Sequence, residues 1–243
     1  MEIEAQDVAV ETGGALLLPP TGVLLAAGRR TLVAGAAGHD LGAHTALALV
    51  LTGRMVPSRG RLLVDGHDVG LWGRDQLRRA AAVVDAPGVD EPEPDLPLRA
   101  AVGEELRGAG RPASAADAHA WLDDLGLAGS AGTAARDLPP GVRTRALAEL
   151  AASRPSVAAL VLVRPDRAGG DARDDDGWWA TAGDLAARGL AVGVLVPPAD
   201  AALVEGAGLL TTSDLRAALG VAHAARPDDL PARPTELAVE ATL

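Results

Sequence analysis

The chain has 243 residues, a formal net charge of −11 at pH 7, 48% hydrophobic residues and no cysteine, phenylalanine or tyrosine. This length fits one large domain with a buried core better than two small ones. Acidic and basic residues are interspersed, which excludes the basic stripe typical of nucleic-acid binding, and the absence of cysteine excludes disulfides, zinc–thiolate sites and cysteine nucleophiles.

The N-terminal residues lack the charged start and the apolar core of a signal peptide. A run of about 18 consecutive apolar residues, as a membrane-spanning helix needs, occurs nowhere in the chain. We therefore expect a cytoplasmic protein without direct membrane insertion, attached peripherally at the inner face of a membrane only through a partner.

Strands surround one helix in the first 64 residues. An apolar run at 31–34 precedes a Gly-rich segment at 35–42, and residues 45–51 have a helical pattern. This order of strand, glycine loop and helix is the one that an anion site at a helix N-terminus requires. Residues 61–69 predict a β-hairpin, since Asp65 and Gly66 form a turn pair that tolerates positive φ.

The rest of the chain alternates between helices and apolar runs. Residues 85–96 are rich in proline and acid and predict an exposed loop. Residues 98–153 are helical in pattern, with a last helix at 143–153. The runs at 157–163 and 190–196, apolar on both faces and separated by a helical segment, predict a parallel sheet covered by helices.

Two details refine the helical region. Ser114 and Asp117 form a predicted capping box at the start of a helix, and Gly126 is placed to end that helix. The helix at 143–153 is expected to stop before Pro155.

Residues 38–45 have the length of the phosphate-loop pattern Gly-x4-Gly-Lys-Ser/Thr, with Ala43 at the second glycine and His44 at the lysine. Imidazole is mostly neutral at pH 7, so it does not replace the permanent charge of lysine. Thr45 keeps a hydroxyl able to ligate magnesium. The candidate nucleotide-binding residues are Gly38, Gly42, Ala43, His44, Thr45 and Ala46. A Gly-rich turn with a surface histidine is the structural alternative.

Further landmarks follow in order. Residues 53–66 contain a Pro-x-x-Gly turn before a strand that ends in Asp-Gly. Residues 138–155 begin with Leu138-Pro139-Pro140-Gly141-Val142 and continue as a helix, and residues 160–165 are a strand that ends in Arg-Pro. In order and spacing, over roughly residues 1–200, the chain resembles the nucleotide-binding domains of the ATP-binding cassette (ABC) family.

The resemblance implies that several functional positions are altered. Leu138, Gly141 and Val142 match the signature Leu-Ser-Gly-Gly-Gln and its helix, but prolines replace the serine and the first glycine and remove backbone N–H donors. At the Walker B motif, Val163 stands where the family has the magnesium-associated aspartate, and Arg164 stands where the family has the catalytic glutamate.

Three further landmarks are altered or displaced. Asp85 takes the place of the family's glutamine and could face a membrane partner. Residues 171–174 resemble the loop after the Walker B strand, shifted by one residue. Pro197-Pro198 follows the strand where the family has a histidine that senses the γ-phosphate.

The resemblance implies an α/β fold: a P-loop NTPase (RecA-like) core with a mostly parallel sheet, an antiparallel β subdomain and a helical subdomain at about 96–155. It places the domain at 1–225 and a C-terminal tail at 226–243. It also implies an ATP-binding subunit of an ABC-type transporter that works with a membrane-spanning subunit and in a homo- or heterodimer of cassettes, binds ATP with Mg²⁺ weakly and hydrolyses it weakly or not at all.

Three alternatives stay open. The chain is a working ATPase in which His44 and either Arg164 or Arg143 neutralise phosphate, or it is a non-nucleotide interaction protein that keeps only the scaffold. Adventitious metal binding at His39, Asp40 and His44 is the third.

Overall fold

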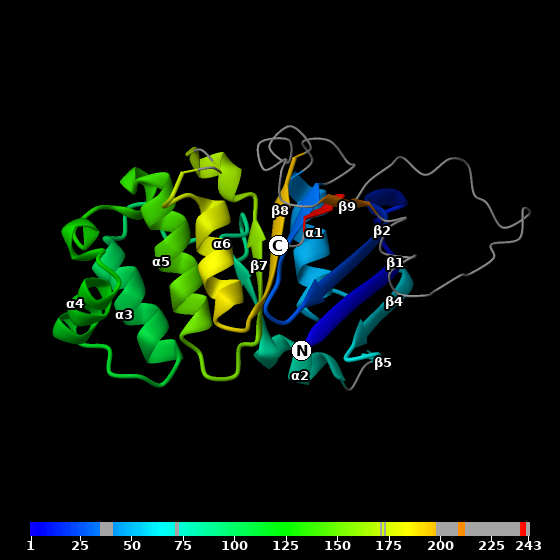
Figure 1. The fold of residues 1–243 in the computed structure, drawn as a ribbon, viewed down its shortest axis with the longest axis horizontal. Coiled ribbons are helices and arrows are strands. Elements are labelled where there is room, and N and C mark those ends of the chain that lie inside the picture. The colour runs from blue at the N-terminus through cyan, green and yellow to red at the C-terminus, as the bar shows by residue number, and fades with distance from the viewer. Residues whose placement is uncertain are drawn as a thin grey trace, which may run out of the picture.

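The computed structural model describes residues 1–34, 41–70, 73–170, 172 and 174–197, together with the backbone of 209–211 and 239–241. The elements lie in layers (Figure 1): an antiparallel sheet, one helix, a parallel sheet, two further helices and a helical part at the far end. The α/β fold with a parallel core, an antiparallel sheet and a helical subdomain is therefore confirmed.

The antiparallel sheet is built from the N-terminal strands and the predicted hairpin. Its strands lie in the order β2-β1-β4-β5, and they are β1 (Glu2–Thr12), β2 (Ala15–Ala26), β4 (Arg59–Val64) and β5 (His67–Asp68). At the predicted turn, Asp65 and Gly66 have φ values of 49° and 78°, as a two-residue hairpin turn requires.

The parallel sheet forms the centre of the molecule. Its strands lie in the order β3-β8-β7-β6, and they are β3 (Arg30–Ala34), β6 (Ala81–Val84), β7 (Ala159–Val163) and β8 (Ala191–Val196). Every residue of β6, β7 and β8 is buried, which explains why these runs are apolar on both faces.

Helices cover both faces of this sheet (Figure 1). Helix α1 (Leu41–Leu51) shares one hydrophobic cluster with the antiparallel sheet and one face of the parallel sheet. On the other face, α5 (Pro140–Ala152) and α6 (Trp178–Ala187) share a second cluster. Helix α1 comes next after β3 in the chain, as predicted, while the residues between them lie outside the described residues.

The helical part has a core of its own. Helices α3 (Leu98–Gly108) and α4 (Ala115–Asp124) pack with one side of α5 in a third cluster. The capping box at Ser114 is confirmed, because its Oγ accepts from the Asp117 backbone N–H and Asp117 accepts from the Ser114 backbone N–H. Helix α5 begins at Pro140, three residues earlier than predicted, because the first helical position needs no backbone N–H donor.

Some elements differ from the sequence prediction. Helix α2 (Gly73–Ala80) was not predicted, since it is short and polar and buries only Leu77. A 3₁₀ turn, η3 (Pro165–Ala168), follows β7. Strand β10 (Val239–Ala241), inside the expected tail, pairs antiparallel with β9 (Leu209–Thr211). The rest of the expected tail lies outside the described residues.

Candidate functional site

The counterpart of the phosphate loop joins β3 to α1. Of the candidate residues, Gly38 lies outside the described residues, while Gly42 and Thr45 are half-buried on α1. Ala43 and Ala46 are buried in the cluster between the two sheets, with 4% and 1% of their surface exposed. The first turns of α1 therefore serve the core as well as any ligand.

His44 is turned into the protein. Its side chain is 3% exposed, and Nε2 lies 3.2 Å from the backbone carbonyl oxygen of Val196 at the end of β8. Because a carbonyl only accepts, Nε2 donates this hydrogen bond. The contact ties α1 to β8 and gives His44 a packing role at the position where the resemblance implies a phosphate-binding lysine.

The carboxyl end of β7 carries no side-chain oxygen. Val163 is fully buried against α1 and the antiparallel sheet. The next residue, Arg164, has left-handed backbone with φ 52°, a conformation that a non-glycine residue rarely adopts. Its guanidinium binds both oxygens of Asp166, with Nη2 2.8 Å from Oδ2. The guanidinium of Arg164, which the resemblance places at the catalytic glutamate, is therefore already paired.

The signature counterpart is only partly buried, with Pro139 exposed and Pro140, Gly141 and Val142 half-buried. Leu138 is buried, and Val142 packs against the same cluster of the helical part. Pro139 is the N-cap of α5, and it offers no side-chain cap. At Gly141 an added Cβ would lie 2.5 Å from the carbonyl oxygen of Asp176, so only glycine fits there without displacing the backbone.

The same segment covers the start of α5 from a second side. A Cβ on Gly170 would lie 3.1 Å from Cβ of Pro140. Gly169, Gly170 and Asp176 therefore lie against the helix end that the family would direct at the nucleotide of an opposing subunit. In the predicted loop after β7, Asp171 and Arg173 lie outside the described residues, and Ala172 is buried.

A network of charged side chains, buried at Asp85 and exposed at Glu91, joins the three parts of the site. Asp85, at the end of β6, accepts from Nε of Arg143 at 2.9 Å and from Nη2 at 2.6 Å. Nη2 of Arg167 lies 3.0 Å from the same carboxylate and donates to the Asp85 carbonyl oxygen at 2.7 Å. Nη1 of Arg167 binds Glu91 at 2.6 Å.

This network connects the loop after β6, the first turns of α5 and the 3₁₀ turn after β7. The hydrogen bond from Asp85 raises the pKa of Arg143 above its ordinary value. The side chain of Asp85 is only 7% exposed, so it faces inward and not toward a membrane partner as the sequence suggested. Sequence reasoning missed the network because its partners are 58 and 82 residues apart, and no local pattern marks such pairs.

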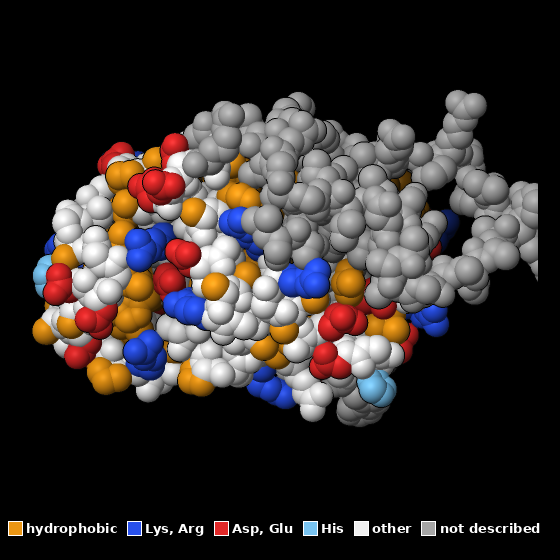
Figure 2. All heavy atoms as spheres, viewed as in Figure 1, with side chains coloured by type: hydrophobic (Ala, Val, Ile, Leu, Met, Phe, Trp, Pro, Cys, Tyr) orange, Lys and Arg blue, Asp and Glu red, His pale blue; other side chains and the backbone are white. Residues whose placement is uncertain are grey.

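The described ranges contain neither a cluster of metal ligands nor a membrane-spanning helix. There, no three His, Cys, Asp or Glu side chains gather where they could hold a metal ion. His39 and Asp40 lie outside the described residues. The helices of the described ranges are all too short or too polar to cross a bilayer. On the face shown in Figure 2, acidic and basic side chains are intermixed over the helical part.

Known proteins resemble the chain in structure alone. No family model and no curated protein matches the sequence. A bacterial Atm1-family ABC exporter solved with ATP bound matches 82% of this chain at 18% identity and a TM-score of 0.58, and the chain spans 35% of that exporter.

Two separate cassettes match over most of their length. A nucleotide-free ATP-binding cassette from an ABC transporter has 17% identity and a TM-score of 0.60, with 82% of this chain and 83% of that one covered. The ATP-binding subunit of an ABC transporter has 16% identity and a TM-score of 0.55, with 93% and 96% covered. The chain therefore has the fold of the ATP-binding cassettes of ABC transporters.

Proposed function

We propose that the chain is a nucleotide-binding-type subunit of an ABC transporter that binds ATP weakly, if at all, and does not hydrolyse it efficiently. The observation that carries the proposal is the carboxyl end of β7, where Val163 is buried and the guanidinium of Arg164 is held by Asp166. Valine cannot ligate magnesium, and arginine does not act as a base at neutral pH.

Asp166 does not restore the missing carboxylate. It accepts three hydrogen bonds from Arg164, and its side chain is 10% exposed. A carboxylate whose two oxygens are both bound to a guanidinium cannot turn to a water molecule without breaking those hydrogen bonds. The alternative of a working ATPase with reassigned residues therefore has little support at this strand end.

The described residues fit a magnesium-bound nucleotide poorly. Magnesium prefers several oxygen ligands in octahedral geometry, and of the candidate residues only Thr45 has a side-chain oxygen. His44 donates its Nε2 hydrogen bond to the Val196 carbonyl. If ATP binds, the backbone N–H groups that precede α1 and the Thr45 hydroxyl would hold it.

The proposed partners are those implied by the resemblance to ABC cassettes. We propose that the chain works with a membrane-spanning subunit and pairs with a second cassette, as a homo- or heterodimer, in the cytoplasm at the inner face of the membrane. Pro139 and Pro140 have no N–H to donate, and Asp176 packs over the start of α5. The chain would therefore support the hydrolysis of a competent partner poorly at this helix and would serve as the structural half of an asymmetric pair.

The domain division is part of the same proposal. We place the cassette at 1–225, with the helical subdomain at about 96–155, and the tail at 226–243. The pairing of β10 with β9 supports a tail that returns to the cassette at Val239–Ala241.

A second candidate is a scaffold that binds no nucleotide. The burial of His44 and its bond to Val196 favour this reading, since they place the side chain in the core and tie it to β8. The two candidates share the fold and the partners and differ only in nucleotide affinity.

Calorimetric titration of the purified chain with ATP and Mg²⁺, followed by an ATPase assay, tests both candidates. Weak binding that Thr45→Val reduces and Thr133→Val leaves unchanged would support the first. No heat and no thermal shift at millimolar ATP would select the scaffold. Turnover of about 1 per second or faster, an ordinary enzyme rate, would refute both.

A further inference from the structure

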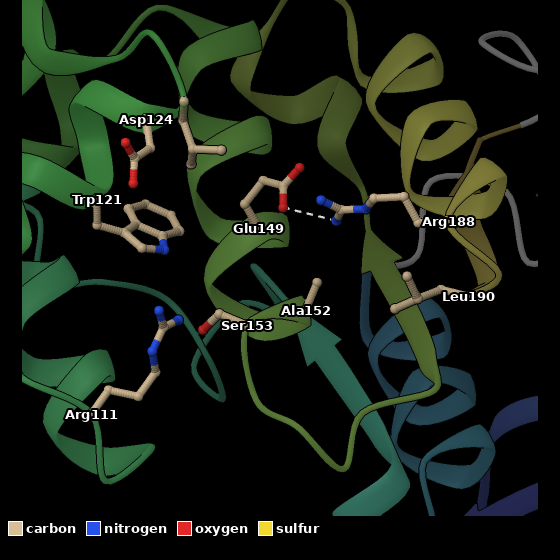
Figure 3. A pocket seen from close by; sticks show the side chains of 9 residues that line it. Arg111, Trp121, Asp124, Glu149, Ala152, Ser153, Arg188 and Leu190 are labelled. Carbon is tan, nitrogen blue, oxygen red and sulfur yellow. Dashed lines mark hydrogen bonds and ion pairs between the residues drawn. The ribbon is translucent and has the colours of Figure 1, made fainter.

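A pocket lies between the helical part and the end of α6, at the opposite end of α5 from the signature counterpart (Figure 3). Its volume is about 370 Å³, which is within the range of small-molecule sites. The 13 residues of α5 put roughly 18 Å between the two ends of this helix. The charged and aromatic side chains that line the pocket are Arg111, Trp121, Asp124, Glu149 and Arg188.

One side of the pocket offers hydrogen-bond donors. Arg111 makes no ion pair or side-chain hydrogen bond with any described residue, and in Figure 3 its guanidinium and the indole nitrogen of Trp121 face the same space. An indole N–H and a guanidinium donate and never accept. Together they match a carboxylate, which a free guanidinium binds through two parallel hydrogen bonds.

The other side offers acceptors. The Glu149 side chain is 13% exposed, and its Oε2 lies 2.8 Å from Nη2 of Arg188. Its second oxygen receives no hydrogen bond from the described residues, although a carboxylate has about four acceptor positions. Asp124 likewise has no ion-pair partner among them, and it lies on the far side of Trp121 from Arg111 in Figure 3.

Both carboxylates of the pocket lie at helix C-termini. Asp124 belongs to the last turn of α4, and Glu149 belongs to the last turn of α5. A helix C-terminus carries partial negative charge and stabilises a nearby cation. The charges of the lining residues sum to zero, with two arginines and two carboxylates, so a ligand of one sign would leave the opposite set unmatched.

We propose that this pocket binds a free α-amino acid with an apolar side chain. Arg111 and the Trp121 N–H hold the carboxylate. Asp124 and the open oxygen of Glu149 hold the ammonium group. The apolar side chain lies on the hydrophobic part of the lining, which consists of Leu125, Ala152 and Leu190. This binding does not depend on nucleotide, so it stands or falls separately from the proposed function.

Titration of the full chain with L-leucine, N-acetyl-L-leucine and L-leucinamide, followed by calorimetry and tryptophan fluorescence, tests the proposal. L-leucine should bind saturably. The acetylated probe lacks the ammonium and the amide lacks the carboxylate, so each should bind about tenfold or more weakly, as expected for the loss of charge-assisted hydrogen bonds.

Matched variants assign the two ends of the ligand. Arg111→Gln should weaken leucine about tenfold and remove its advantage over leucinamide, whereas Arg107→Gln, on the neighbouring α3, should change nothing. Asp124→Asn should weaken the binding of leucine and leave the binding of N-acetyl-leucine unaffected. Asp123→Asn should change neither. Thermal unfolding confirms that each variant is folded.

Three results would overturn the proposal. The first is no leucine binding at a concentration tenfold above about 1 mM, which is the weak end of ordinary ligand affinity. The second is equal binding of the three probes. The third is an equal effect of each variant and its matched control. The ATP titration is read separately on the same protein, so failure of the pocket and failure of the proposed function remain distinguishable.

Discussion

Replacement of Asp85 by asparagine should destabilise the protein more than any exposed charge change. The carboxylate is 7% exposed, and its partner Arg143 is 13% exposed. Removing one member of a buried ion pair costs about 3–5 kcal/mol, because the other charge stays buried without compensation. Since asparagine keeps one acceptor oxygen, we expect a loss of about 3 kcal/mol.

Replacement of the partner, Arg143, should destabilise the protein less. In Arg143→Met, Asp85 keeps Arg167 at 3.0 Å, so about 2 kcal/mol is expected. The double variant should lose less than the sum of the two, by roughly 1–2 kcal/mol, because the second change removes an interaction that is already broken. Asp75→Asn is the control. Its carboxylate is 71% exposed and pairs with Arg78, and such a pair contributes under about 1 kcal/mol.

Urea unfolding of the single and double variants measures these free energies. The slope of the transition should stay constant, and the midpoint should shift. A loss below about 0.5 kcal/mol for Asp85→Asn, the ordinary range for surface changes, would refute the reasoning. Strict additivity in the double variant would refute it as well, since additive effects mean that Asp85 and Arg143 do not interact.

Three further changes test other parts of the structure. Gly141→Ala should lower stability by about 1–3 kcal/mol, since its Cβ would lie 2.5 Å from the Asp176 carbonyl oxygen, whereas Gly108→Ala, with no atom within 4 Å, should be neutral or stabilising in thermal unfolding. Ser114→Ala removes the confirmed N-cap of α4 and should cost about 1 kcal/mol in urea. Desolvation by its surrounding loop, together with the nearby charge of Glu105, raises the pKa of Asp90 from an ordinary 3.8 to about 6, so the folded state loses stability as pH rises from 4 to 6. Asp90→Asn should remove that decline. Because Asp90 keeps much of its surface in contact with water, which screens such a shift, the gain at pH 7.5 should be no more than about 1 kcal/mol; a lower stability than the parent at pH 7.5 would contradict this.

The secondary structure was largely readable from local patterns. Residues 65 and 66 form the predicted turn because two positive φ angles suit an Asp-Gly pair. The predicted strands near 160 and 193 are fully buried, as runs apolar on both faces require. Helix α2 was missed because its single buried side chain, Leu77, leaves no apolar stripe to recognise.

The position of each charged group was not readable. Arg164 was expected at a strand end, but only the structure shows it bonded to Asp166. The bond from His44 to Val196 spans 152 residues of sequence. Pairs so far apart depend on how the strands are ordered in the sheet, and one sequence contains no direct record of that order.

The sequence by itself determined which functional groups are absent. Valine at 163 has no side-chain oxygen, and proline at 139 and 140 has no backbone N–H, in any conformation. A chain without lysine likewise has no side-chain ammonium group. Only the tertiary structure decided what the remaining groups do. Hydrogen bonds and ion pairs require contact within a few ångströms, and it is the packing of β6, α5 and the turn after β7 that brings Asp85 together with Arg143 and Arg167.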